Sequence, residues 1–451
     1  MTNSKPLSLK DWGERQARIA AERMGLSVSA TGLTKRRAGF RQTVRPAKGS
    51  VLAAPITADT PPDYFFHWLR DASVVMDATL VLIRQGGETA DIWTRHFDDY
   101  VDFSLKLWEL NGSAFLPQLT SIRASTEPDL TQYIRPDAEI AAINSDSVAG
   151  DVRFNANGTL DFLKWNRPQH DGVATRALGA MNFWDMGVSS SSEARTRLAA
   201  LIRADLDYTE QHAGEPCVDI WEEEHALHYY TVLVQFAALQ EGVRWMEMQD
   251  EEEQATYLKA RAAPLLAMLD GFWSPELGIY RSRLFPDGRP SSKDTDMSVI
   301  LGVLHAGMLE GPHNVDDQKV LATLNAAEDY FAEALSINAK GEAEAYKGVA
   351  FGRYRGDAYF NGGAWFPCTF AAAEFHYRLA ASAKASADSI SVAEHLAKGD
   401  AIMEHARQFI PASGELTEQF DRDTGASLSA HDLSWSYAAF LTAWEAREAS
   451  V

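Results

Sequence analysis

Two glutamate-containing stretches carry the residue types that could hydrolyse a glycosidic bond. Glu222 lies beside Trp221 in "DIWEEEH", residues 219–225, and Glu418 lies in a polar loop in "TEQFDRD", residues 417–423. Glycosidic hydrolysis needs one protonated carboxyl group to release the leaving oxygen. It also needs one ionised carboxylate to act on water or on the anomeric carbon. Glu222 is the better candidate for the acid, because acidic neighbours and an indole would favour its protonated form. Glu418 is the better candidate for the base.

The same residues also have a purely structural interpretation. Asp219 followed by Glu222 is typical of a capping box, and acidic residues in a first turn complement the helix dipole. A helix N-terminus would favour the ionised form of Glu222, so sequence alone does not decide which influence on its proton prevails. Glu418, taken alone, is an ordinary loop glutamate.

Six clusters that mix aromatic and charged residues favour the chemical interpretation. An aromatic ring can cover the apolar face of a pyranose, while Asp and Arg hydrogen-bond its hydroxyls. One solvated charged face is common, but aromatic residues recur in all six clusters or beside them, which indicates a carbohydrate site. The clusters are "DYFFHWLRDAS" at 63–73, "WNRPQHDG" at 165–172, "DIWEEEH" at 219–225, "SSKDTD" at 291–296, "GRYRGDAYFNGGAW" at 352–365 and "TEQFDRD" at 417–423.

Helical periodicity dominates the chain, and alternating strand patterns are scarce. With no internal repeat and no low-complexity linker, residues 1–451 are expected to form a single domain of the all-α class. Twelve helices are predicted, near 8–26, 71–85, 89–110, 172–185, 192–212, 222–242, 251–270, 296–308, 316–335, 365–382, 389–409 and 432–447.

The connections between these helices alternate in length. They are short after the even-numbered helices, as in "QGG" at 85–87, and mostly long after the odd-numbered ones, as at 111–171. Short connections are typical of antiparallel helix hairpins. Six hairpins closing into a double ring would bring the clusters, which precede the even-numbered helices, together at one mouth.

Composition excludes several classes of partner and location. The net charge of −21, from 63 acidic and 42 basic residues, would repel nucleic acid and an anionic membrane surface. No window is apolar enough to span a bilayer, and the N-terminus lacks the apolar region of a signal peptide. The protein is therefore expected to be cytoplasmic. Cys217 and Cys368 are expected to be free, buried thiols.

No cofactor or metal is predicted. The chain contains no HExxH spacing, Walker A loop or dinucleotide fingerprint. "DRDTGASLSAHD", residues 421–432, begins like a calcium loop, but Ala426 stands where that loop needs glycine.

The motifs resemble those of the glucoamylase family, glycoside hydrolase family 15. "PDYFFHWLRDAS", "RPQHDG", "DIWEE", "GRYRGDAYFNGGAW" and "TEQFDRDTGASLSAHDLSWSYAAFLTA" match in order and spacing, over essentially the whole chain. The resemblance implies an (α/α)6 barrel, in agreement with the hairpin count. It also implies an inverting, exo-acting hydrolase that releases β-glucose from the non-reducing ends of α-glucans.

The resemblance also assigns roles to individual residues. It implies that Glu222 is the general acid and Glu418 the general base, and it gives no role to Glu224, for which a solvated charge is expected. Further residues match positions that bind the terminal glucose, or that surround the scissile bond and the next sugar. These are Tyr64, Trp68, Arg70, Asp71, Trp165, Asp219, Trp221, Glu223, Arg353 and Trp365.

Some features narrow the expected substrate, and others leave it open. Gly356 stands where an acidic residue is expected, on the side of the leaving sugar. Neither a starch-binding module after Val451 nor an N-terminal β-rich domain is seen, which favours short soluble oligosaccharides of the maltose or isomaltose type. The linkage, α-1,4 or α-1,6, is open. Trehalase activity and an inverting disaccharide phosphorylase on a related barrel are the alternatives, and a non-catalytic sugar-binding protein is a third. A monomer is favoured.

Overall fold

The fold consists mainly of α-helices, with a few short strands. The computed structural model describes residues 7–58, 61–339 and 347–451. The helices are α1 (Leu9–Gly25), α2 (Leu69–Arg84), α3 (Gly87–Trp108), α4 (Gly112–Ser125), α5 (Asp137–Ala141), α6 (Asp171–Met186), α7 (Ser192–Gln211), α8 (Tyr229–Met248), α9 (Glu252–Asp270), α10 (Ser298–Ala306), α11 (Gln318–Ala334), α12 (Phe366–Ala385), α13 (Ser389–Arg407) and α14 (Ser434–Ser450).

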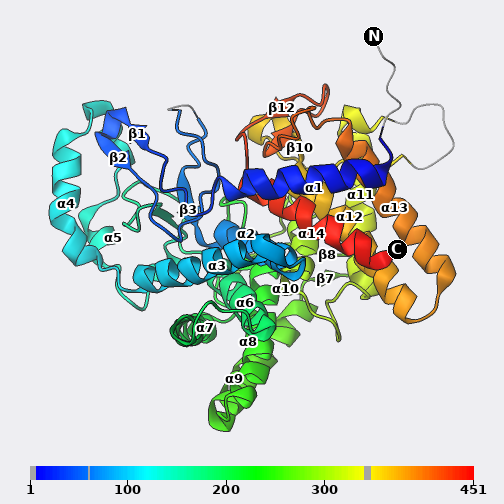
Figure 1. Ribbon diagram of the computed structural model, residues 1–451, viewed down its shortest axis with the longest axis horizontal. Coiled ribbons are helices and arrows are strands. Elements are labelled where there is room, and N and C mark those ends of the chain that lie inside the picture. The colour runs from blue at the N-terminus through cyan, green and yellow to red at the C-terminus, as the bar shows by residue number, and fades with distance from the viewer. Residues whose placement is uncertain (1–6, 59–60, 340–346) are drawn as a thin grey trace.

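Twelve of these helices form two concentric rings (Figure 1). Successive contacts join α2, α6, α8, α10, α12 and α14 and then return to α2, which closes the inner ring. Each inner helix packs against one outer helix: α3, α7, α9, α11, α13 and, for α14, the first helix α1. The predicted (α/α)6 barrel is confirmed, and its sixth pair joins the two ends of the chain.

Inner helices are buried on all sides and outer helices on one side only, and their sequences differ accordingly. Inner helix α8 is buried without interruption from Tyr229 to Leu239, because it is covered on all sides. Outer helix α3 buries only one stripe, which includes Trp93, Phe97 and Tyr100, and it turns polar residues outward.

Short strands hold the loops at one end of the barrel, and three of them run directly into inner helices. These are β3 before α2, β6 before α8 and β10 before α12. The strands are β1 (Lys35–Arg37), β2 (Gln42–Val44), β3 (Phe66–Trp68), β4 (Arg153–Asn155), β5 (Cys217–Val218), β6 (His225–His228), β7 (Trp273–Ser274), β8 (Ile279–Tyr280), β9 (Arg283–Leu284), β10 (Ala364–Trp365), β11 (Gln419–Phe420) and β12 (Ser427–Leu428). They pair antiparallel in the orders β1-β2, β3-β4, β5-β6-β9, β7-β8 and β10-β11-β12.

The structure corrects the predicted helices in two places. Helix α8 spans Tyr229–Met248 rather than 222–242. It begins later because 217–228 forms the β5-β6 hairpin, and it ends six residues later than predicted. Helices α4 and α5 lie in 111–171, which was expected to be a loop. Pro117 inside α4 and the many small polar residues around it hide its helical pattern. The other predicted helices begin and end within about three residues of the observed ones.

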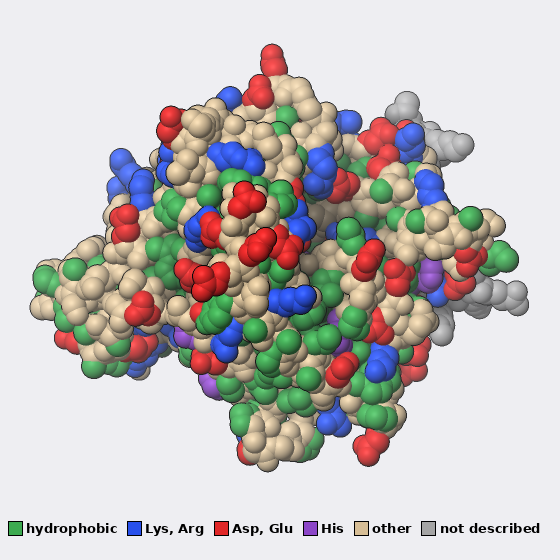
Figure 2. Space-filling model, turned by 90° about the horizontal axis from the view of Figure 1, so that it is seen from below, with side chains coloured by type: hydrophobic (Ala, Val, Ile, Leu, Met, Phe, Trp, Pro, Cys, Tyr) green, Lys and Arg blue, Asp and Glu red, His purple; other side chains and the backbone are tan. Residues whose placement is uncertain are grey.

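The chain has more acidic than basic residues, and the described residues on the face shown in Figure 2 form no basic patch. On the face shown in Figure 2, Lys and Arg side chains are dispersed among acidic and apolar ones rather than gathered in a patch. Within the described parts of the chain, no helix combines the length and apolar character needed to cross a membrane. Cys217 and Cys368 are buried and free, as predicted.

Candidate active site

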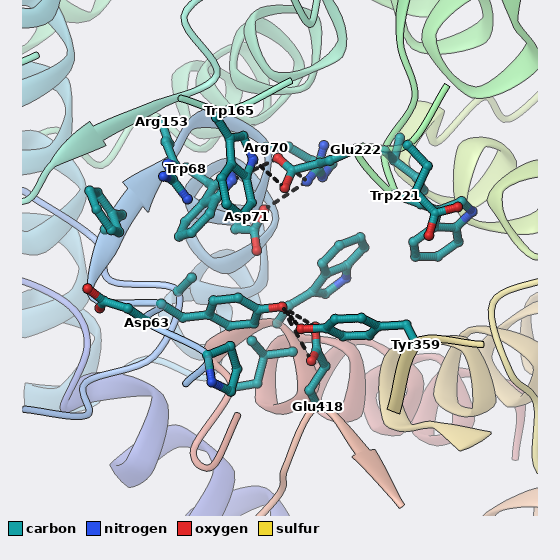
Figure 3. Close-up of a pocket in the computed structure, with 18 of the residues that line it drawn as sticks. Asp63, Trp68, Arg70, Asp71, Arg153, Trp165, Trp221, Glu222, Tyr359 and Glu418 are labelled. Carbon is teal, nitrogen blue, oxygen red and sulfur yellow. Dashed lines mark hydrogen bonds and ion pairs between the residues drawn. The ribbon is translucent and has the colours of Figure 1, made fainter. Parts of the chain in front are cut away.

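Five of the six aromatic and charged clusters converge on one pocket at the N-terminal ends of the inner helices (Figure 3). Its volume is about 500 Å³, within the range of roughly 300–1,000 Å³ that is usual for small-molecule sites. Cluster 291–296 contributes instead to an adjoining hollow. All the predicted site residues except Asp219 line the pocket: Tyr64, Trp68, Arg70, Asp71, Trp165, Trp221, Glu222, Glu223, Arg353, Trp365 and Glu418.

Glu222 lies in a tight turn and not in the first turn of a helix. Its φ of 63° is in the left-handed region, which is uncommon for a residue with a side chain. Asp219 closes the turn, because its Oδ1 accepts hydrogen bonds from the backbone N–H of Glu223 at 2.7 Å and of Glu224 at 3.3 Å. The predicted capping box is therefore wrong: the carboxylate of Asp219 organises a turn between two strands instead.

Three N–H donors hold the carboxylate of Glu222. Two of them belong to Trp68 and Trp165, which lie beside it in Figure 3. Trp68 Nε1 donates to Oε1 at 2.9 Å and Gln169 Nε2 to the same oxygen at 3.1 Å, while Trp165 Nε1 donates to Oε2 at 2.6 Å. The guanidinium of Arg70 lies 4.0 Å from Oε1. Both carboxylate oxygens of Glu222 therefore accept hydrogen bonds from N–H donors, and a guanidinium lies close by.

Glu418 lies on the opposite side of the pocket from Glu222 (Figure 3). Each of its carboxylate oxygens accepts a hydrogen bond from a hydroxyl group. Tyr64 donates to Oε1 at 3.2 Å and Ser429 donates to Oε2. The residue is only 3% exposed, although its polar sequence suggested an open loop. Burial raises the pKa of Glu418 to about 7, and the hydrogen bond from Ser429 and the charge of Arg353 only partly oppose this.

A guanidinium and a carboxylate lie side by side in the first turn of α2. Arg70 Nη2 is 3.4 Å from Asp71 Oδ2, and Arg70 Nη1 is 3.1 Å from Asp171 Oδ2 and 2.9 Å from Gln169 Oε1. Burial raises the pKa of Asp71 to about 6, and the charge of Arg70 opposes it. The pair presents fixed donors and acceptors of the kind that bind sugar hydroxyls.

Glu223 is held by cations on the outer side of the pocket. Arg353 Nη2 is 3.1 Å from its Oε1, Tyr354 Oη donates to its Oε2 at 2.6 Å, and Lys293 also contacts Oε2. Burial acts to raise the pKa of Glu223, but the charge of Arg353 and the bonds from Lys293 and Tyr354 outweigh it and lower the pKa.

Asp219 and Glu224 form a brace behind the pocket. Arg283 Nη1 lies 2.9 Å from Asp219 Oδ2 and 2.5 Å from Glu224 Oε2, and Arg283 Nη2 lies 2.6 Å from Asp296 Oδ2. Asp219 is therefore not among the residues that line the pocket. Its carboxylate instead holds the turn that carries Glu222. Glu224, expected to be a solvated charge, is paired with Arg283.

Several lining residues were not singled out from the sequence. Tyr359, whose Oη lies 2.9 Å from Tyr64 Oη, and Trp435 belong to quoted motifs and could have been named. Asp63 also lies in a quoted cluster. Arg153 carries no such signal, because it lies between the clusters at 63–73 and 165–172 and belongs to none of the quoted motifs.

Gly356 borders the adjoining hollow on the side expected for the leaving sugar. Its φ is 80°, and a Cβ there would meet nothing within 4 Å. The hollow has a volume of about 440 Å³ and also contacts Glu223, Lys293 and Arg355. The absence of a side chain at Gly356 leaves this side open.

One group of side chains outside the pocket has the composition of a metal site. The ligand atoms of His170, His212 and Glu215 lie within 4.8 Å of one another. The two imidazoles are stacked with an interplanar angle of 8°, so their in-plane lone pairs lie in two nearly parallel planes and cannot both point at one ion. His170 Nδ1 and His212 Nδ1 are also occupied, by Tyr208 and Glu215. We assign no metal to this group.

Comparison with known proteins agrees with the barrel and the pocket. The sequence model described as "Glycosyl hydrolases family 15" matches residues 148–445. A glucoamylase of Blastobotrys adeninivorans is 29% identical over 89% of this chain and 68% of its own length. A probable glucoamylase of Schizosaccharomyces pombe is 26% identical over 99% of this chain and 93% of its own. The structure of the family 15 glucoamylase from Hypocrea jecorina superposes with a TM-score of 0.78, at 24% identity, over 98% of this chain and 73% of that one.

The family match and the glucoamylase relatives show that the protein is a glycoside hydrolase, and its double ring of helices and carboxyl-lined pocket agree with this. Because the matching residues make up well over half of the sequence, the chain belongs to glycosyl hydrolase family 15. Its substrate is a carbohydrate, and its activity is that of an α-glucoside hydrolase.

Proposed function

We propose that the protein removes single glucose units from the non-reducing ends of short α-gluco-oligosaccharides and releases β-D-glucose with inversion. The observation that carries this proposal is the placement of Glu222 and Glu418, which face each other from opposite sides of one pocket (Figure 3). Each carboxyl group has its own set of hydrogen-bond donors. A pocket of this size admits the end of a sugar chain, whereas a long cleft would admit its middle.

Glu222 is the proposed general acid. It gives its proton to the glycosidic oxygen, and the developing carboxylate is stabilised by Trp68, Trp165 and Gln169. Donors that bind the ionised form more strongly than the neutral form lower the barrier to proton release.

Glu418 is the proposed general base. The burial that raises its pKa to about 7 makes the ionised carboxylate a stronger acceptor for a proton from water. After one turnover Glu222 is ionised and Glu418 is protonated, so the pocket must exchange both protons with solvent before the next cycle.

The leaving sugar is proposed to lie toward Glu223 and the hollow beside Gly356. Arg353 and Lys293 fix the Glu223 carboxylate, which can accept hydrogen bonds from sugar hydroxyls. The hollow beside Gly356 can accept a short chain, with either an α-1,4 or an α-1,6 link.

The stereochemistry of the product tests the proposal. Proton NMR during early turnover of maltose should show β-glucose first, before mutarotation mixes the anomers. The two carboxyl groups should also stand roughly 6.5–9.5 Å apart, as in inverting enzymes, rather than about 5–5.5 Å. Appearance of α-glucose first would refute inversion.

A substrate panel separates the remaining alternatives. Glucose release from maltose, isomaltose, maltotriose and dextran, with trehalose alongside, reports the linkage and the preferred length. Turnover that required inorganic phosphate and produced glucose 1-phosphate would identify a phosphorylase instead. Failure to release glucose from every member of the panel would refute the proposed activity.

A further inference from the structure

One cation lies against both indoles that hold Glu222. The guanidinium carbon of Arg153 is 3.6 Å from the ring centroid of Trp165 and 5.0 Å from that of Trp68. Trp165 donates to one carboxylate oxygen of Glu222 and Trp68 to the other. Arg153 therefore contacts the rings bonded to both oxygens of the proposed acid (Figure 3).

The backbone and a buried ion pair fix the position of Arg153. Strand β4 pairs with β3 so that Arg153 stands directly opposite Trp68. Its Nε lies 2.8 Å from Asp161 Oδ2, and the two side chains are 3% and 1% exposed. Burial lowers the pKa of Arg153, and the charge of Asp161 opposes this.

The ion pair belongs to a longer buried chain of charges. Asp161 also binds Arg167 at 2.9 Å, Arg167 binds Asp151 at 2.6 Å, and Asp151 binds Arg135 at 2.8 Å. Well-packed apolar residues usually stabilise a fold as well as buried ion pairs do. Packing alone therefore gives little reason for a guanidinium over the faces of these two indoles.

We propose that Arg153 is a positioning residue for the catalytic acid, acting through the indoles of Trp165 and Trp68. A cation over the face of an indole is attracted by its π electrons and fixes the ring. It also draws electron density from the ring, which makes the N–H a stronger donor to the carboxylate of Glu222. This inference rests on the proposed role of Glu222.

The effect should be visible in rate and in pH dependence. The charged and titratable groups that face Glu222 include Arg70, Asp71, Tyr64 and Arg153. Arg153→Met removes only the last. We expect kcat on maltose to fall about ten-fold with KM changed less than about three-fold, because the lost contacts support the transition state. The alkaline limb of kcat/KM should move to higher pH, because the ionised acid is less well stabilised.

Two further variants keep the test informative if Arg153→Met is poorly folded. Arg153→Lys keeps the charge and the ion pair but loses the planar stack, so kcat should fall to an intermediate value. Arg135→Met is the matched control, because Arg135 is also 3% exposed and belongs to the same chain of charges, at its far end. It should lower the melting temperature without moving the alkaline limb.

A double-mutant cycle measures the coupling directly. In a Trp165→Phe background, which lacks the indole N–H, Arg153→Met should lower kcat less than it does in the parent. Equal losses in both backgrounds, or the same kinetic loss from Arg135→Met, would overturn the inference. The variant Glu222→Gln separates a failure of the inference about Arg153 from a failure of the proposed role of Glu222. If that variant is inactive while Arg153→Met is normal, only the inference fails, but if it stays active, the proposed role of Glu222 fails as well.

Discussion

Replacing Glu418 with glutamine should abolish activity and yet stabilise the folded protein at alkaline pH. Burial raises the pKa of Glu418 from an ordinary 4.5 to about 7. The folded state thus holds a proton on this carboxyl group that the unfolded chain releases. The contribution to stability is complete below pH 4.5 and is lost as the pH rises through about 7.

The size of the effect follows from the same two values. The pKa of Glu418 is 4.5 in the unfolded chain and about 7 in the folded protein, a difference of about 2.5. At about 1.36 kcal/mol per pH unit, the loss of stability above pH 8 is roughly 3 kcal/mol. A glutamine side chain at this position would resemble the protonated glutamate and would not incur that cost. For a chain of 451 residues, this corresponds to a melting temperature raised by roughly 3 °C.

Thermal unfolding of the two proteins between pH 4 and pH 8 tests this expectation. Their melting temperatures should agree at pH 4 and diverge as the pH rises, with the glutamine variant the more stable. Glu276→Gln is the control, because Glu276 is exposed and the same substitution there should produce no such divergence. If Glu418→Gln and the wild type lose stability in parallel from pH 5 to pH 8, the argument from burial is refuted.

The same geometry makes further predictions for activity and stability. Because the base must be ionised, the acidic limb of kcat/KM should lie well above 4.5, toward the value of about 7 for Glu418, and a limb at or below 4.5 would contradict this. Glu222→Gln should lower kcat by about 10²–10⁴-fold while substrate binding persists, as measured by steady-state kinetics and calorimetry. Arg283→Leu leaves Asp296 buried without its cation and should cost about 3–5 kcal/mol in denaturant unfolding. Gly49→Ala should also destabilise the protein by thermal unfolding, because φ is 84° and the new Cβ would lie 1.9 Å from a backbone carbonyl oxygen of α3.

The ring of hairpins could be predicted because its signals are local. Apolar periodicity and short connections locate most helices, and the order of the motifs indicates which helix ends share the mouth. The start of α8 could not be found in this way. The acidic residues 222–224 are compatible with a helical first turn, and only the pairing of β5 with β6, stabilised by Asp219, excludes it.

The environments of the two candidate carboxyl groups depend on contacts between distant segments. The polar neighbours of Glu418 suggested an exposed loop, yet packing from other parts of the barrel leaves it 3% exposed. The N–H donors around Glu222 come from residues 154, 57 and 53 positions away. Arg153 lies beside these donors because β4 pairs with β3 and places it opposite Trp68. The two strands are far apart in the sequence, and no motif links them.

The pairing of α1 with α14 has a consequence for the order in which the protein can be built. Because α1 packs against α14, the ring cannot close on a ribosome until residues 434–450 have emerged. Until then, the apolar flanks of α2 and α12 that α14 covers face solvent, and Trp435 is missing from the pocket wall. A chain whose α14 has not yet docked therefore lacks both a closed ring and a complete pocket wall, so the docking of this one helix completes the barrel and the site together.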